Sequence, residues 1–197
     1  MKNTFLIIFV FTSLSFNSSL YAQSENNLDD IILIEGNYLR NLGSFGEVWS
    51  QAAGVYVGYG LFFEDHNLLM FRSGYMRHEL RDEEDDNGSL AVIPLQVGGR
   101  YYFANTGIMP FFQFMNGFNI IFENMTLSGE PSDRTLVRYF WQVGIGGTLS
   151  LSENINIDLG INYNAAFYEN NKELYEDAGA MMTGFEYTIG FGWKLNN

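Results

Sequence analysis

Hydrophobic and polar residues alternate along most of the chain with a period of two. In residues 181–195, seven of the eight odd positions are apolar or aromatic, and six of the seven even positions are glycine, polar or charged. Such alternation is typical of a β-strand with one apolar and one polar face. The pattern recurs, and it predicts eight strands at residues 31–40, 54–63, 67–80, 91–103, 110–122, 136–150, 154–166 and 181–195.

The connections between these strands fall into two classes that alternate along the chain. Short connections lie around residues 64–67, 104–109 and 151–153, and the long ones span residues 41–50, 81–89, 123–135 and 167–179. Antiparallel up-and-down strands would place all long loops at one end and both termini at the other. The sequence therefore predicts an all-β, eight-stranded antiparallel up-and-down β-barrel. Its strands have the length of tilted membrane strands, and soluble strands are usually shorter, about 5–6 residues.

Such a sheet could close in two ways: as a soluble lipocalin-like barrel with its apolar face inside, or as a transmembrane barrel with that face against lipid. The polar face is rich in glycine and carries charges, which suits a confined interior. The apolar face carries aromatic side chains that would overfill an eight-stranded lumen. The sequence therefore favours the transmembrane barrel. One residue does not fit the pattern: Pro94 falls inside the fourth strand, where we expect a bulge near the long-loop end.

The aromatic residues of the apolar face gather toward the two ends of the predicted strands. Interfacial girdles of this kind flank the apolar band of outer-membrane barrels. The short-turn end carries Phe63, Phe71, Tyr101, Phe103, Phe112 and Trp193, and the long-loop end carries Tyr38, Tyr75, Phe118, Phe122, Tyr139 and Phe185.

Three segments resemble the small outer-membrane β-barrel domain family of Gram-negative bacteria. Residues 93–103 (IPLQVGGRYYF) look like its mid-barrel strand, residues 149–155 (LSLSENI) like its periplasmic turn, and residues 190–195 (GFGWKL) like the closing strand read by the barrel-assembly machinery. The chain departs from the commonest closing signal because Asn197, not an aromatic residue, is last. The resemblance covers residues 28–197. It implies an outer-membrane location with periplasmic N- and C-termini, and no particular activity.

The N-terminus has the features of a secretory signal peptide. Lys2 precedes an apolar stretch at residues 5–16, and Ala22 is a plausible cleavage point. We therefore expect a signal peptide at residues 1–22, a short periplasmic segment at 23–30 and the barrel domain at 31–197. The chain has no Cys, so disulfides cannot stabilise it and no lipid-anchoring Cys follows the cleavage point.

Composition and charge narrow the choice further. A mean hydropathy of -0.05 excludes a bundle of membrane helices. The formal net charge of -13 argues against nucleic acid as a partner. The four long loops carry about ten net negative charges, so we expect an anionic outer rim that favours basic partners or bridging cations.

The most acidic loop, residues 81–88, contains a fragment of a calcium-binding pattern. An EF-hand frame starting at Glu83 would place Pro94 where a bidentate Glu is required, and we expect no EF-hand there. A solvated acidic loop is the favoured interpretation. Loose divalent-cation binding to lipopolysaccharide is the alternative.

Charged side chains on the polar face are candidates for a network in the lumen. Counting residues from the short-turn end places Glu35, Arg72, Arg100 and Asp158 in one layer, with Arg138, Glu186 and His78 in a second. The favoured interpretation is a set of paired charges that fills the lumen. The alternative is a gate whose pairs rearrange to pass small ions. The full set is Glu35, Arg72, His78, Arg100, Arg138, Asp158, Glu186 and Lys194.

No catalytic constellation is recognisable from residue spacing. His66 falls in a short turn, and His78 points inward with no Ser at a matching position on its strand. We therefore expect no catalytic residues, cofactor or metal. The predicted role is structural or surface interaction, with a narrow channel as the alternative and a lipid-modifying enzyme as the third class. The expected partners are outer-membrane lipid and lipopolysaccharide, together with the barrel-assembly machinery during biogenesis, and the barrel is expected to be a monomer.

Overall fold

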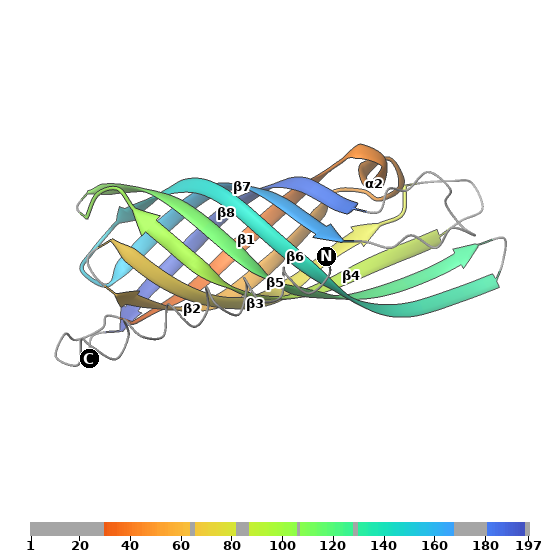
Figure 1. The fold of residues 1–197 in the computed structure, drawn as a ribbon, viewed down its shortest axis with the longest axis horizontal. Coiled ribbons are helices and arrows are strands. Elements are labelled where there is room, and N and C mark those ends of the chain that lie inside the picture. Colours follow the sequence, from red (N-terminus) through yellow and green to blue (C-terminus); the bar gives the residue numbers. More distant parts are fainter. Residues whose placement is uncertain are drawn as a thin grey trace, which may run out of the picture.

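Eight antiparallel strands close into a barrel in the order of the chain, with β1 paired to β8 (Figure 1). The computed structural model describes residues 30–63, 66–81, 87–105, 107–127, 130–167 and 181–195. The predicted signal peptide lies outside the described residues. The eight-stranded up-and-down barrel is confirmed. Its elements are β1 (Asp30–Leu42), α2 (Gly43–Val48), β2 (Ala52–Phe63), β3 (Asn67–Glu79), β4 (Asn87–Tyr102), β5 (Ile108–Leu127), β6 (Glu130–Ser150), β7 (Ile155–Phe167) and β8 (Met181–Leu195).

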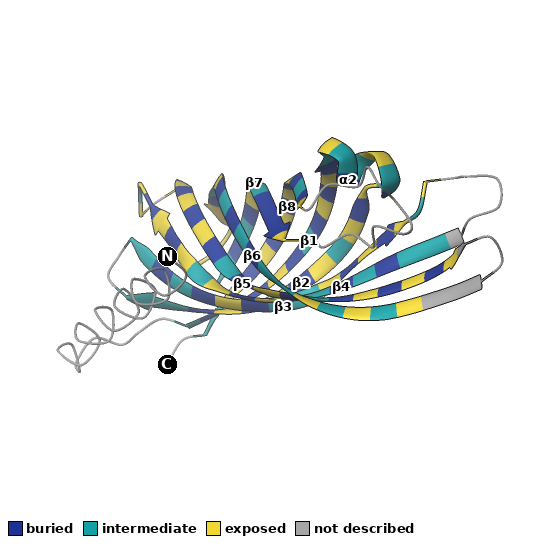
Figure 2. Cartoon of the chain, turned by 45° about the vertical axis from the view of Figure 1, so that its right-hand side comes forward, coloured by how far each residue is buried: buried dark blue, intermediate teal, exposed yellow. Residues whose placement is uncertain are grey.

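The apolar face of the sheet points outward. Along β8, Tyr187 and Ile189 are 43% and 62% exposed, while Glu186 between neighbouring outward residues is fully buried. Exposed and buried bands alternate in this way on every strand (Figure 2). A lipocalin-like barrel would turn the apolar face of its sheet inward, so the structure excludes that alternative. An outward belt of large apolar side chains is what a hydrocarbon environment requires.

Glycines on the inner face leave room for the large side chains of the lumen. A Cβ built on Gly146 would lie 2.3 Å from the Phe111 ring, and one on Gly190 would lie 3.0 Å from Cγ of Glu35. Interiors this crowded need positions without side chains. The glycine content of the polar face therefore reflects packing inside a narrow barrel.

The hairpin of β5 and β6 extends beyond the other strands (Figure 1). Pairing continues to Leu127 and Glu130, so the predicted long loop at residues 123–135 is wrong over most of its length. Glu123 and Arg134 face each other across the hairpin, with Nε–Oε1 and Nη2–Oε2 distances of 2.8 and 2.9 Å. Both faces of this extension carry polar residues, so alternation of apolar and polar positions could not reveal it.

The predicted loop at residues 41–50 contains the short helix α2. Phe45 and Trp49 are 0% and 1% exposed, so this segment folds inward onto the barrel. No helix among the described residues is long and apolar enough to cross a membrane.

Pro94 lies in β4 without the expected bulge. Ser73 pairs with Leu95 and Met76 pairs with Val92, which preserves one register across the interruption. Proline has no N–H to donate, so the ladder is interrupted locally without an inserted residue. The side chain of Pro94 faces the lumen, where it is buried.

Candidate functional site: the buried charge network of the lumen

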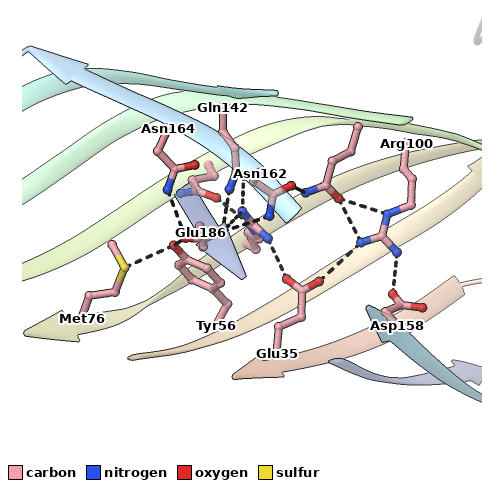
Figure 3. A network of polar contacts seen from close by, with 12 residues as sticks. Glu35, Tyr56, Met76, Arg100, Gln142, Asp158, Asn162, Asn164 and Glu186 are labelled. Carbon is pink, nitrogen blue, oxygen red and sulfur yellow. Dashed lines mark hydrogen bonds and ion pairs between the residues drawn. The ribbon is translucent and has the colours of Figure 1, made fainter. Parts of the chain in front are cut away.

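Five of the eight predicted charged residues form one buried network in the middle of the lumen (Figure 3). Nη1 of Arg72 donates to Oε2 of Glu35 at 2.7 Å, and Nη2 of Arg100 donates to Oε1 of the same carboxylate at 3.4 Å. Arg100 also donates to Asp158 at 2.5 Å. The fifth member is Glu186. All five residues are at most 5% exposed, so the ion pairs are shielded from bulk water.

Glu186, on β8, is the hub of this network. Its Oε1 lies 3.7 Å from Nη2 of Arg72, and the Tyr56 hydroxyl donates to its Oε2 at 2.6 Å. Side-chain amides complete the shell, donating from Gln142 at 2.6 Å and from Asn162 and Asn164 at 3.2 Å each. A carboxylate has about four lone-pair sites, so these four neutral donors satisfy the anion. Both oxygens of the Glu186 side chain therefore have hydrogen-bond donors.

Each guanidinium also packs on an aromatic ring. The Arg72 guanidinium carbon lies 4.3 Å from the Tyr56 ring centroid, and that of Arg100 lies 3.9 Å from the Phe111 centroid. Their Nε atoms donate to amide oxygens of Gln96 and Gln113 at 2.5 and 3.2 Å. Desolvated guanidiniums need such a full set of partners. Geometry and hydrogen bonding together hold both arginines in one position.

The buried network contains three carboxylates and two guanidiniums. The Thr148 hydroxyl donates to Oδ1 of Asp158 at 2.6 Å, so that carboxylate too has partners on both oxygens. Within the described residues, no group of three or more His, Asp or Glu is placed to hold a metal ion. Each charged group of the network therefore has ionic or hydrogen-bonding partners, as in a structural network.

Three predicted residues lie apart from this network. His78 is fully buried, and its Nδ1 lies 3.0 Å from Nδ2 of Asn41. Arg138 is half-buried, and its Nη1 donates to the Val137 carbonyl at 3.2 Å. Lys194 is half-buried with its ammonium 5.5 Å from the Phe62 ring centroid.

The expected second layer of Arg138, Glu186 and His78 is therefore wrong, because Glu186 joins Arg72 and Glu35. Strands in a barrel are tilted and staggered, so equal counts from the strand ends do not give equal heights. The long Arg72 side chain also reaches both Glu35, of the predicted first layer, and Glu186, of the predicted second.

Apolar side chains fill the lumen on both sides of the network. The predicted side-chain-filled polar lumen is therefore filled by apolar clusters as well as by the paired charges. The short-turn side holds Ile31, Leu33, Leu68, Met70, Tyr102, Met109, Phe111 and Met115. The long-loop side holds Leu39, Phe45, Trp49, Ala52, Tyr56, Met76, Leu90, Val92, Ile121, Met125, Phe140, Ala166 and Met182.

Sequence reasoning missed the neutral members of the network. The amide side chains occupy polar-face positions and could have been found by their parity alone. Tyr56 was missed because aromatic residues were assigned to the lipid face, although it alternates with Val55 and Val57 and so points inward. Its hydroxyl has a charged partner inside, which makes the inward position favourable.

Neither histidine is placed for acid–base catalysis among its described contacts. The His66 ring stacks on Tyr101 with centroids 6.1 Å apart. His78 contacts Asn41, the Ser50 carbonyl and the Phe45 ring. The five acidic residues at 82–86, which belong to the fragment of a calcium-binding pattern, lie outside the described residues.

No protein-family model matches the sequence, and a search of the curated proteins finds no match. Solved structures do match. Ail of Yersinia pestis is 12% identical, with 86% of this chain and 100% of that chain covered and a TM-score of 0.59. Ail in complex with the heparin analogue sucrose octasulfate matches at 13% identity, covering 86% of this chain and 100% of Ail, with a TM-score of 0.57.

Two further matches come from other bacteria. Neisserial surface protein A is 17% identical over 84% of this chain and 97% of its own, with a TM-score of 0.56. OprG of Pseudomonas aeruginosa is 12% identical over 86% of this chain and 97% of its own, also with a TM-score of 0.56. At these identities the likeness concerns the fold. The chain has the fold of the small eight-stranded outer-membrane β-barrels.

Proposed function

We propose that this protein is a non-catalytic outer-membrane β-barrel whose role is interaction at the cell surface. One observation carries the proposal: the lumen is filled by a satisfied charge network between two apolar clusters, while the β5–β6 hairpin extends outward. A filled lumen serves as a rigid support. The segments available for function are then the projecting strands and the long loops, as is usual for rigid scaffolds.

The exterior supports an outer-membrane location. Every strand presents large apolar side chains outward, and the strands are long enough for a tilted crossing. In this setting both termini lie on the periplasmic side, the outward face contacts lipid and lipopolysaccharide, and the barrel-assembly machinery inserts the chain. Anomalous gel mobility before boiling, in outer-membrane fractions, tests the location. A protein that stays soluble and shows no mobility shift contradicts it.

Charge specifies the kind of surface partner. The long connections carry about ten net negative charges, five of them at residues 82–86. Complementary charge on two proteins speeds their association, and like charge disfavours the binding of wrong partners. Ail has been solved with a sulfated, anionic heparin analogue. The acidic rim of this chain favours the opposite class, a basic protein segment.

Binding of charged probes to the barrel in proteoliposomes tests this proposal. We expect fluorescent polylysine to bind and heparin not to bind. Replacing the five acidic residues at 82–86 with Asn or Gln should weaken polylysine binding by about tenfold at low salt. Neutralising Glu64 and Asp65, which fall in a connection predicted to be short and periplasmic, is the control and should leave polylysine binding from the outer side unchanged. Binding of heparin, or equal polylysine binding by all variants, contradicts the proposal.

A narrow ion channel is the second candidate, because buried Arg–carboxylate pairs are groups that could rearrange to admit ions. Planar-bilayer recordings of the wild type and of Arg100→Ala separate the two roles. Conductance in either protein, larger after Arg100→Ala, supports a gate. If neither protein conducts, the filled lumen has a structural role only.

A further inference from the structure

The segment that contains α2 packs against β1 and β8 at the long-loop end and buries two aromatic side chains in the lumen. Phe45 and Trp49 stack with centroids 6.4 Å apart and join the apolar cluster of the lumen. The segment begins at Gly43, whose φ of 61° lies in the left-handed region that favours glycine. Its far end is fixed by backbone hydrogen bonds, from Ser50 N to the Glu79 carbonyl and from Arg81 N to the Val48 carbonyl. It has the geometry of a lid with a glycine at one hinge.

Asn41 and His78 hold the inner side of this lid. Nδ2 of Asn41 donates to the Ser50 carbonyl at 2.6 Å and to the Trp49 carbonyl at 3.3 Å. Nδ1 of His78 lies 3.1 Å from the Ser50 carbonyl, and the Phe45 ring packs edge-on against the imidazole at 5.6 Å. Two side chains of the barrel wall thus bind the backbone and the aromatic ring of the lid.

The other imidazole nitrogen has no hydrogen-bond partner among the residues that the structure describes. Nε2 of His78 is buried without a hydrogen bond, and His78 is 0% exposed. A neutral imidazole leaves that nitrogen as an unused acceptor or donor. A second proton would place both a positive charge and an unpaired donor in apolar surroundings, which is strongly unfavourable.

The described neighbours offer no carboxylate to compensate that charge. On β3, Arg77 and Glu79 are exposed and point outward. His78 pairs with Leu90 on β4, and the β2–β3 register ends at the neighbouring pair of Ala53 and Arg77, next to buried Ala52. Glu47 on α2 is exposed.

Deeper in the lumen and across it, the charged groups already have partners. Glu186 accepts hydrogen bonds from Tyr56 and three amides, and Glu123 is paired with Arg134. The other inward-facing charged side chain described on β6, Arg138, is itself cationic.

We propose that α2 is an acid-sensitive lid, in which protonation of buried His78 releases residues 43–50 from the mouth of the barrel. Lifting the lid brings water to the imidazolium and removes the Phe45 ring that covers it. The charged imidazole and the apolar Phe45 ring then no longer share a site from which water is excluded. The closed and open states differ by one proton, so acid shifts the balance toward the open state by up to about tenfold per pH unit while His78 titrates.

Thiol labelling of single-cysteine variants tests the lid, because the natural chain has no Cys. Ala166→Cys places a thiol in the cluster that contains Phe45 and Trp49, and Met70→Cys places one in the cluster at the opposite end. Each is assayed in proteoliposomes with a small water-soluble disulfide reagent at about pH 7.5 and about pH 4. Every rate is divided by that of free cysteine at the same pH. A pulse of acid followed by neutral pH establishes that the change is reversible.

We expect the normalised rate of Ala166→Cys to rise at least about tenfold in acid, while Met70→Cys stays protected. Adding His78→Gln should abolish the rise, and gel mobility before boiling verifies that this variant is folded. If His78→Gln does not fold, His78→Asn serves the same purpose. Unchanged labelling in acid, an equal rise at Met70→Cys, or a rise that persists without the imidazole would each overturn the proposal.

Discussion

Replacing Arg72 with Met isolates the energetic contribution of the lumen network. Arg72 is 5% exposed and contacts Glu35 at 2.7 Å, Gln96 at 2.5 Å and Glu186 at 3.7 Å. Met keeps much of the apolar volume and removes the charge. Among the described residues, Glu186 then loses its cation, and Glu35 loses the nearer of its two, keeping Arg100 at 3.4 Å. Breaking a buried ion pair in this way costs about 3–5 kcal/mol. We therefore expect the free energy of unfolding to fall by about 4 kcal/mol, a change of about a thousandfold in the unfolding equilibrium.

The control lies five residues along the same strand. Arg77 faces outward, and its Nε lies 3.9 Å from Glu79 with side chains that are 55% and 72% exposed. Exposed pairs of this kind contribute about 0–1 kcal/mol. Arg77→Met should therefore leave stability almost unchanged. The assay is urea unfolding in detergent micelles, followed by tryptophan fluorescence and by gel mobility before boiling.

A second substitution distinguishes a lost ion pair from general damage to packing. Adding Glu186→Gln to Arg72→Met removes the carboxylate whose described ion pair is lost, so we expect it to recover about 1–3 kcal/mol. The reasoning is refuted if Arg72→Met is no more destabilising than Arg77→Met. It is also refuted if Glu186→Gln adds its own loss to the double variant instead of reducing the loss.

Two further predictions use the same unfolding assay. Tyr56→Phe removes the hydroxyl that donates to Glu186 at 2.6 Å, and we expect a loss of about 1.5–3 kcal/mol with the fold retained; a loss below 0.5 kcal/mol would contradict the hub role. Gly146→Ala places a Cβ 2.3 Å from the Phe111 ring and should cost about 1–3 kcal/mol. Gly147→Ala, whose Cβ would meet nothing closer than 3.9 Å, should be neutral, and equal effects at both glycines would contradict the packing argument.

The alternation of apolar and polar positions predicted the barrel because each inward or outward choice depends only on neighbouring residues. Once β8 presents Tyr187 outward, Glu186 must point inward. The same local rule identified the charged members of the network. It could not predict which charges meet, because strand stagger and side-chain reach decide whether Arg72 contacts Glu186.

The β5–β6 extension and the helix α2 could not be predicted, because neither has a regular pattern of apolar and polar residues. In the extension of β5 and β6, polar residues occur on both faces beside the buried Met125, so the sequence does not alternate there. The cross-strand pair of Glu123 and Arg134 is one of the contacts that hold it. The six-residue helix α2 is too short for a helical period to emerge, and its burial depends on contacts with the distant cluster of the lumen.

The pairing of β1 with β8 joins the two ends of the sequence, with Asp30 opposite Leu195 and Leu42 opposite Thr183. Among the described strands, this pairing spans the greatest distance in sequence, so it is expected to form late in folding. Glu35 lies on β1 and Glu186 on β8, so the two arginines gain their full set of acceptors only when that last seam closes. An open sheet would keep two unpaired edges and two poorly compensated guanidiniums. The network therefore makes an incomplete barrel less stable than a complete one and ties the final step of assembly to the presence of both ends of the barrel.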